Sequence, residues 1–152
     1  MSVVVLGSGS RWYSGRERVF AAWDQVRDRF GGFVLRHGAC PTGFDVLCQE
    51  WADARGVTTD PVPADWDSCG WDCPPTAHRR GKRPGDVHHP GMLDDFCPGA
   101  GPRRNARMVD RGAVLLVAAP MALGGGTRNC MRLAKAARIP VWDITKPAGR
   151  PW

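Results

Sequence analysis

Short apolar runs alternate with amphipathic stretches along most of this 152-residue chain. The strand-like apolar runs occupy residues 2–6, 33–37, 57–63, 115–119 and 139–144. The third run contains two prolines, which cannot donate to a sheet ladder, so we expect it to be short or to lie at an edge. Apolar positions recur at helical spacing over residues 14–30, 42–54, 102–111 and 127–138. Strands that alternate with helices predict an α/β protein whose parallel sheet is covered on both faces.

Polar residues mark the starts of two predicted helices. Ser14 and Glu17 have the spacing of a capping box, in which each side chain accepts a backbone N–H of the first helical turn. Thr42 and Asp45 are placed in the same way before the second helix. Glycines then follow the first three predicted helices, at residues 31, 56 and 112.

The connections between these elements predict the order of the strands. Right-handed crossovers make 3-2-1-4-5 the economical order, which gives a Rossmann-like three-layer sandwich with a mostly parallel five-stranded sheet. The first and fourth strands are then neighbours, and both run into glycine-rich loops, residues 7–11 and 124–127. Glycines let backbone N–H groups approach an anion, and a helix N-terminus adds positive potential. The two loops together predict a phosphate site.

Composition and charge indicate which classes of protein and partner the chain fits. With 43% hydrophobic and 24% charged residues, the chain has the size and balance of one globular domain, residues 1–152. No apolar run approaches the roughly 18 residues of a membrane span, and the first six residues lack a signal-peptide pattern, so we expect a cytoplasmic protein with no membrane partner. The net charge of +6 favours an anionic partner. Few aromatic or amide side chains accompany the basic runs, which makes nucleic acid the less favoured one.

Residues 67–100 form a Cys- and His-rich insert with little periodicity, and a loop of this length in a compact domain needs a stabilising element. The candidate metal ligands are Cys69, Cys73, His78 and Cys97. Their spacing is C-x3-C-x4-H-x18-C, and three thiolates with one imidazole make a closed tetrahedral set. The sequence therefore predicts a structural Zn²⁺ that stabilises the insert, with His88 or His89 as alternatives to His78. A disordered loop with incidental thiols is the alternative to any metal.

Five motifs occur in order along the chain: Gly7-Ser8-Gly9-Ser10-Arg11, His37-Gly38-Ala39-Cys40-Pro41-Thr42-Gly43-Phe44-Asp45, Ala64-Asp65-Trp66, Gly101-Pro102-Arg103-Arg104-Asn105 and Gly124-Gly125-Gly126-Thr127. Together they resemble the motifs of the YspA-like branch of the SLOG superfamily, named for the SMF/DprA and LOG proteins. The resemblance spans nearly the whole chain apart from the insert. It implies a Rossmann-like domain that binds a nucleotide or nucleotide-derived ligand, such as an ADP-ribose-like molecule or a nucleoside phosphate. Many members sense or process such ligands, often in phage and bacterial conflict systems, and relatives commonly form homodimers.

These motifs supply the candidate ligand-binding residues, which are Gly7, Ser8, Arg11, Gly38, Thr42, Gly43, Asp45, Arg104, Asn105, Gly124, Gly125, Gly126 and Thr127. Amides around Gly125 would cradle a phosphate. Arg104 lies in the first turn of a predicted helix, where a cation opposes the macrodipole and needs an anion nearby. Asn105 offers a donor and an acceptor to a base or sugar. Trp66 would either stack on a base or pack in the core.

Two further functions stay open. The LOG branch removes the base from nucleoside 5′-monophosphates with an Arg and a Glu, but Cys130 stands at the position of that Glu. A thiol cannot stabilise an oxocarbenium-like transition state as a carboxylate does, so a hydrolase would use Asp45 as its candidate catalytic residue, with an arginine. The DprA side of the superfamily implies association with single-stranded DNA instead. The place of Cys130 in the first turn of a helix also predicts a lowered thiol pKa.

Overall fold

The computed structural model describes residues 2–147 and 149–152. In chain order its elements are β1 (Val3–Gly9), α1 (Arg16–Phe30), β2 (Phe33–His37), α2 (Phe44–Arg55), β3 (Thr59–Pro61), β4 (Arg80–Gly81), β5 (Asp95–Phe96), α3 (Ala100–Asp110), β6 (Leu115–Ala119), α4 (Gly126–Ala136) and β7 (Val141–Asp143). The main sheet has the order β3-β2-β1-β6-β7, and every neighbouring pair is parallel. The predicted α/β fold and the strand order 3-2-1-4-5 are therefore confirmed. None of the helices in the described part of the chain is long and apolar enough to cross a bilayer.

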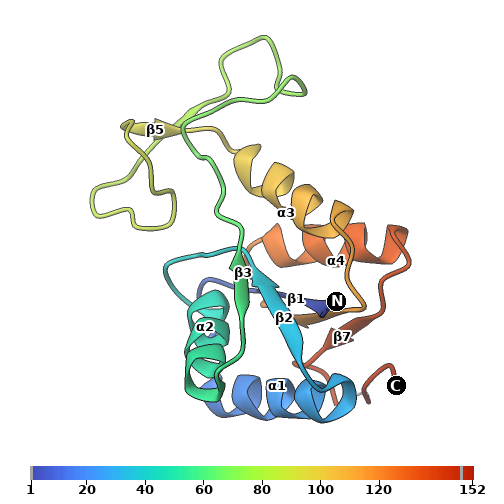
Figure 1. Ribbon diagram of the computed structural model, residues 1–152. Coiled ribbons are helices and arrows are strands. Elements are labelled where there is room, and N and C mark those ends of the chain that lie inside the picture. The colour runs from blue at the N-terminus through green and yellow to red at the C-terminus, as the bar shows by residue number, and fades with distance from the viewer. Residues whose placement is uncertain (1, 148) are drawn as a thin grey trace.

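Helices cover both faces of this sheet, with α1 and α2 on one face and α3 and α4 on the other (Figure 1). Strand β6 contributes side chains to the hydrophobic cores on both faces of the sheet. Leu115 and Val117 pack into the core beside α1 and α2, whereas Leu116 and Ala118 pack into the core beside α3 and α4. Side chains alternate across a strand, so a strand buried on both faces must be apolar at every position.

Three aromatic rings form the centre of the α1–α2 core. Trp23 stacks on Phe33 and on Trp51, with ring centroids 5.9 Å apart in both pairs. Both tryptophans are fully buried. Burying a large side chain of this kind contributes about 3 kcal/mol of apolar transfer free energy, so this trio is a main source of the stability of the layer.

The predicted cap of α1 is wrong. This helix begins at Arg16 with Gly15 as its N-cap, and no side chain caps it. The backbone oxygen of Ser14, rather than its hydroxyl, accepts the N–H of Arg16 at 2.8 Å.

The predicted capping box of α2 is also wrong, because its two polar side chains bond to neighbouring loops. Thr42 donates its hydroxyl to the backbone oxygen of Arg11 at 2.9 Å, and Asp45 accepts the N–H of Cys40 at 3.0 Å. The N-cap is Gly43, whose φ of 76° suits glycine and whose added Cβ would lie 2.5 Å from the backbone oxygens of Ser10 and Arg11, in the loop after β1.

The segment of residues 67–100, called the Cys/His segment below, lies beyond the carboxyl ends of the strands (Figure 1). Its regular structure is one short antiparallel pair, β4 with β5, in which Arg80 is opposite Phe96. A second short pair, Lys82 N–H to Asp94 oxygen at 2.9 Å, extends the contact. The rest of the segment is turns and bends.

Candidate functional site

A cleft of about 870 Å³ opens at the carboxyl ends of the parallel strands. Its floor comes from the ends of β1 and β2 and from the turn between β6 and α4, and the Cys/His segment forms a further wall. The candidate ligand-binding residues that line it are Ser8, Arg11, Gly38, Asp45, Arg104, Asn105, Gly124, Gly125, Gly126 and Thr127. Residues from both ends of the chain thus meet at the point where parallel sheets usually bind ligands.

Three other candidates do not line the cleft. Gly7 lies within β1, and a Cβ added there would meet Trp23 at 3.0 Å on the core side of the sheet. Thr42 and Gly43 shape the loop before α2, where the Thr42 hydroxyl also lies 2.9 Å from the Nε2 atom of His88. Thr42 thus links the first loop to the Cys/His segment, whereas Gly43 lies against the backbone of Ser10 and Arg11.

The turn between β6 and α4 leaves its backbone open to the cleft. Gly124 has a φ of 88°, and no atom lies within 4 Å of a Cβ added to Gly125 or Gly126. Gly125 is the N-cap of α4 and lacks a side-chain hydrogen bond. The amides of the first helical turn are therefore available to an anion, and the helix dipole favours one there.

Asn105 holds this turn in place. Its Nδ2 atom donates to the backbone oxygen of Gly126 at 3.1 Å and to Oδ1 of Asn129 at 3.0 Å. Its Oδ1 atom accepts from Nε of Arg104 at 2.9 Å. These bonds use the donor and acceptor that the sequence assigns to a base or sugar, so Asn105 positions the turn.

Arg104 connects two walls of the cleft. Its guanidinium donates to the backbone oxygen of Gly38, just after β2, and its Nε bonds to Asn105 on α3. A Cβ added to Gly38 would lie 2.5 Å from the Arg104 guanidinium, so a larger residue there would displace this side chain from its contact. Burial lowers the pKa of Arg104, and the nearby Asp45 carboxylate opposes that shift.

Asp45 is a buried carboxyl at the edge of the cleft, with 6% of its surface exposed. Burial raises its pKa, and the hydrogen bond from the N–H of Cys40 and the positive charge of Arg104 oppose that shift. The Nδ1 atom of His37 accepts the N–H of Ala39 at 3.0 Å, which leaves Nε2 to donate to Gln49 at 2.8 Å. The carboxyl is thus placed among fixed donors and faces the cleft.

Sequence reasoning misses several residues that line the cleft: Trp12, Arg80, Arg83, His88 and His89. Trp12 is 62% exposed, and its ring contacts that of His88 edge to face with centroids 4.9 Å apart. The basic run around Arg80 is visible in the sequence, but only the fold brings it to the cleft. Trp66 packs edge to face against His89 and Phe96, with ring centroids 4.7 Å and 5.8 Å apart, and also lines the cleft.

The four predicted metal ligands come together in the Cys/His segment, and their ligand atoms all lie within 4.8 Å of one another. Nε2 of His78 is 3.3 Å from Sγ of Cys69 and 3.7 Å from Sγ of Cys97. The sulfurs of Cys73 and Cys97 are 3.5 Å apart, too far for a disulfide. A tetrahedral Zn²⁺ with bonds of about 2.3 Å to sulfur separates its ligands by about 3.7 Å, so this set could hold a metal ion.

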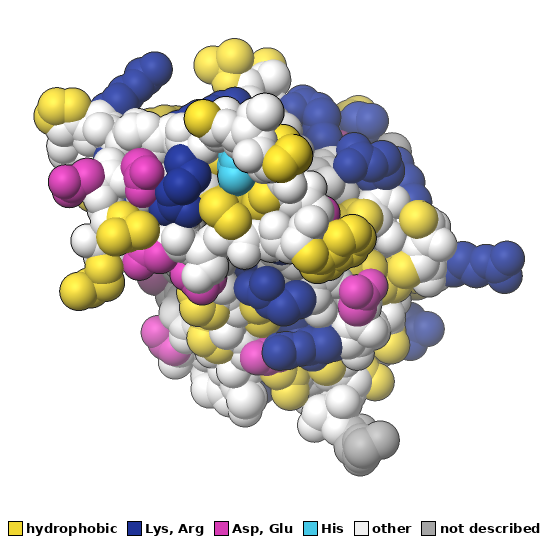
Figure 2. Space-filling view, turned by 90° about the horizontal axis from the view of Figure 1, so that it is seen from above, with side chains coloured by type: hydrophobic (Ala, Val, Ile, Leu, Met, Phe, Trp, Pro, Cys, Tyr) yellow, Lys and Arg dark blue, Asp and Glu magenta, His cyan; other side chains and the backbone are white. Residues whose placement is uncertain are grey.

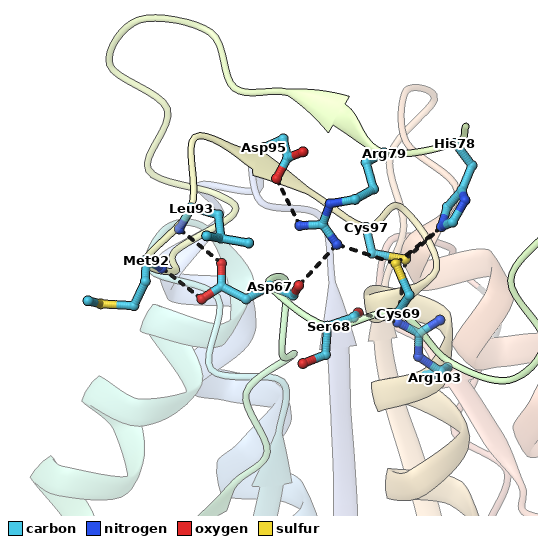
Figure 3. Close-up of polar contacts among 10 residues, drawn as sticks. All are labelled: Asp67, Ser68, Cys69, His78, Arg79, Met92, Leu93, Asp95, Cys97 and Arg103. Atoms are coloured by element: carbon cyan, nitrogen blue, oxygen red, sulfur yellow. Dashed lines mark hydrogen bonds and ion pairs between the residues drawn. The ribbon is translucent and has the colours of Figure 1, made fainter. Parts of the chain in front are cut away.

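Neighbouring groups orient these ligands (Figure 3). The backbone oxygen of Thr76 lies 3.0 Å from Nδ1 of His78 and directs Nε2 toward the sulfurs. Arg103 donates to Sγ of Cys73 at 3.2 Å, and Arg79 donates to Sγ of Cys69 at 3.3 Å. Two guanidinium groups thus lie against the sulfurs and would offset negative charge there when a metal is bound.

The pKa of Cys97 falls to about 6 because hydrogen bonds from Arg103, the Gly99 amide and the other ligands outweigh its burial, which acts in the opposite direction.

The histidines that the sequence leaves as alternatives lie elsewhere. His89 pairs with Asp86 at 2.7 Å, and His88 contacts Thr42. His78 is therefore the histidine of the cluster.

The predicted lowering of the Cys130 pKa is wrong. Burial raises it to about 11, and the attraction of Ser8 and Arg104 does not compensate. The helix starts beside the cleft, but the Cys130 side chain is buried in the α3–α4 core. A neutral, buried thiol is a poor nucleophile.

Three comparisons relate the chain to known proteins. A sequence model of the "YspA, cpYpsA-related SLOG family" matches residues 2–68. The "Gene 61 protein" of Mycobacterium phage D29 is 32% identical over 146 residues, which cover 90% of this chain and 92% of the phage protein. A molybdenum cofactor binding protein from the phototrophic bacterium Rippkaea orientalis superposes with a TM-score of 0.60 over 93% of this chain and 75% of its own. At 16% identity, this last similarity concerns the fold alone.

Proposed function

Because the chain belongs to the YspA, cpYpsA-related SLOG family, we propose that it binds a nucleotide or nucleotide-derived ligand in the cleft at the carboxyl edge of its sheet. The ligand is an ADP-ribose-like molecule or a nucleoside phosphate. The protein acts as a sensor or sequestering protein, and its phage relative favours a setting in conflict between phage and bacterium. The homodimer and the cytoplasmic location stay predictions.

One observation carries the proposal: the open amides at Gly125 and Gly126 share a cleft with Arg11 and Arg104. A phosphate at the start of α4 would accept backbone N–H bonds and lie near the half-buried charges of Arg11 and Arg104. The exposed ring of Trp12 offers an aromatic face to a base at the same cleft. The size of the cleft, about 870 Å³, suits a nucleotide.

The test fills the phosphate position without disturbing the fold. Gly125 has a φ of −101°, which any residue adopts, and the space beside it is empty, so Gly125→Val should fold. We expect nucleoside phosphates and ADP-ribose to raise the melting temperature of the wild-type protein at millimolar concentration, and Gly125→Val to lose that shift because its side chain occupies the anion position.

The matched control is Gly32→Val, a substitution between α1 and β2 where an added Cβ also meets no atom within 4 Å. It should keep the ligand-induced shift of the wild type. A broad nucleotide panel that leaves the wild-type melting temperature unchanged contradicts the proposed function.

Turnover of the ligand is the second candidate, favoured by the place of Asp45. A buried carboxyl with a raised pKa, close to an arginine and facing a cleft, has the environment of an acid–base or stabilising group in N-glycosidic cleavage. Release of free base from a labelled nucleotide by the purified protein, lost in Asp45→Asn, would establish a hydrolase. Binding without release would leave the sensor.

Single-stranded DNA is the least supported ligand. The arginines of α3 form hydrogen bonds within the protein. Arg103 donates to the cysteine sulfurs, Arg104 to Gly38 and Arg107 to Pro63. Figure 2 shows Lys and Arg side chains in separate groups with apolar and acidic ones between them, rather than in one continuous stripe. Binding to a single strand with a steep salt dependence would restore this alternative.

For the metal centre we propose a structural Zn²⁺. A closed Cys₃His set leaves no coordination position for a substrate, and thiolate with imidazole suits zinc. On this proposal residues 1–152 are one domain, with residues 67–100 as an insert that the ion stabilises. Metal analysis of protein purified without added metal should find close to one zinc per chain.

A further inference from the structure

In two pairs of adjacent arginines, one side chain contacts the cluster of candidate metal ligands and the other lines the cleft. On α3, Arg103 donates to the sulfurs whereas Arg104 lines the cleft. Arg79, just before β4, contacts Cys69 and Asp95, whereas Arg80, the first residue of β4, lines the cleft. Successive side chains of a strand point to opposite sides, which explains the second pair.

The arginines on the metal side have anionic partners. Arg79 pairs with Asp95 at 2.9 Å, and Arg103 lies 3.6 Å from Asp72. On the cleft side, Arg80, Arg83 and Arg11 form no ion pair with a carboxylate within the described residues. The acidic residues that line the cleft are Asp45, which is buried, and Asp86, which pairs with His89. The cleft therefore holds positive charge that the protein leaves uncompensated.

The backbone that carries these cleft arginines is held in place. Asp86 accepts the N–H groups of His88 and His89 and forms an ion pair with the His89 ring. That ring stacks on Phe96 of β5 with centroids 3.7 Å apart. The N–H of Asp86 closes a turn onto the oxygen of Arg83 at 3.1 Å. Because the backbone is already held, binding would restrict the arginine side chains but not the chain that carries them.

We propose that Arg80 and Arg83 form a second anion subsite, which the Cys/His segment adds to the cleft. With the amides of the β6–α4 turn as the first subsite, the cleft selects ligands that carry at least two phosphate groups, such as a nucleoside diphosphate or a pyrophosphate-linked nucleotide. A nucleoside monophosphate occupies the first subsite and leaves the two guanidinium groups solvated. This inference rests on the proposed function, since it names the ligand class of the same cleft.

The test compares mono- and diphosphates of adenosine, guanosine, cytidine and uridine by isothermal titration calorimetry. We expect wild-type protein to bind one diphosphate at least about tenfold more tightly than its monophosphate, since each arginine–phosphate contact is charge-assisted. In Arg80→Gln/Arg83→Gln this preference should disappear, while the affinity for the monophosphate stays within about threefold. The preference should also weaken with added salt, because exposed arginines are screened.

The control variant is Arg132→Gln/Lys135→Gln, which removes two positive charges from exposed positions of α4 that do not line the cleft. It should keep the tenfold preference. Equal binding of mono- and diphosphate by the wild type, or an unchanged preference in Arg80→Gln/Arg83→Gln, overturns the second subsite and leaves the proposed function intact. Failure of every nucleotide to bind overturns both.

Discussion

The sheet core and the Cys/His segment border the same cleft, yet different interactions hold them. The core buries a continuous set of apolar side chains on both faces of β1 and β6. In residues 67–100 the buried apolar side chains are Phe96, Cys97 and Ala100, whereas Trp71 and Met92 are almost fully exposed. Hydrophobic burial therefore accounts for the core, whereas the segment has a cluster of side chains that could hold a metal ion, with arginine contacts around it.

This contrast shows which interactions fix the position of each wall of the cleft. The floor is set by parallel strands whose register the core fixes. The far wall is set by four ligand atoms and by polar contacts such as Asp67, which accepts the N–H groups of Met92 and Leu93 (Figure 3). A segment with little apolar surface to bury needs such specific bonds to have one structure.

The largest effect should come from the core. Trp23→Ala removes a fully buried ring that stacks on Phe33 and Trp51, and we expect it to lower the free energy of unfolding by about 3–5 kcal/mol. Urea denaturation measures this change. Met92→Ala in the Cys/His segment is the control, since its side chain is 93% exposed and its loss should be nearly neutral. Equal losses in the two variants would break the contrast between the regions.

Next in size is the loss of a metal ligand. Cys73→Ser should abolish metal binding and increase hydrogen exchange throughout residues 67–97, while exchange in β1 and β6 stays slow. Metal analysis and exchange mass spectrometry provide the two readouts. Cys40→Ser, a thiol outside the cluster, should keep both the metal and the protection. A Cys73→Ser protein with unchanged exchange in the segment would show that the metal does not hold it.

A smaller effect is expected where the regions meet. Arg103 extends from α3 of the core to the sulfurs of Cys73 and Cys97. Arg103→Gln should weaken metal affinity about 10- to 100-fold, as for other groups that bond to metal ligands, with little change in the stability of the sheet. Competition with a chromophoric chelator measures the affinity. Arg107→Gln, one turn along the same helix and bonded to Pro63, should leave it unchanged.

The smallest effect concerns Asp45. Because burial raises its pKa in the folded protein, the folded state holds the proton more tightly, and stability falls as pH rises from the ordinary Asp pKa through the raised one. Asp45→Asn should therefore melt a few degrees higher than wild type at pH 7, with the difference shrinking toward pH 4. Thermal melting across this pH range checks it. A lower melting temperature of the variant at pH 7 would mean that the carboxylate stabilises the fold.

Much of the fold could be predicted because it depends on local patterns. The apolar run of β6 and the glycines after it are contiguous, and the handedness of crossovers then fixes which loops are neighbours. The three cysteines of the candidate metal site could be predicted for a similar reason, since their choice depends on residue type and spacing within one segment, whereas spacing left His88 and His89 as alternatives to His78.

Other features could not be predicted because they depend on contacts between distant residues. Thr42 looks like a helix cap, but the backbone of Arg11 and the ring of His88 take up its hydroxyl. Cys130 looks activated by its helix, but the α3–α4 core surrounds it. Gly7 looks like part of a ligand loop, but it lies in β1 and faces Trp23.

The sequence by itself determined the alternation of strands and helices, the strand order, the open glycine turn before α4 and the three cysteines of the Cys₃His set, because each follows from short-range pattern and residue chemistry. The tertiary structure selected His78 as the histidine of that set. Only the tertiary structure decided that Arg80, Arg83 and Trp12 line the same cleft as the glycine turn. It also decided that Asn105 donates its hydrogen bonds to this turn and to α4 rather than to a ligand. Burial and the direction of a side chain depend on what packs around it from elsewhere in the chain, and no local pattern carries that information.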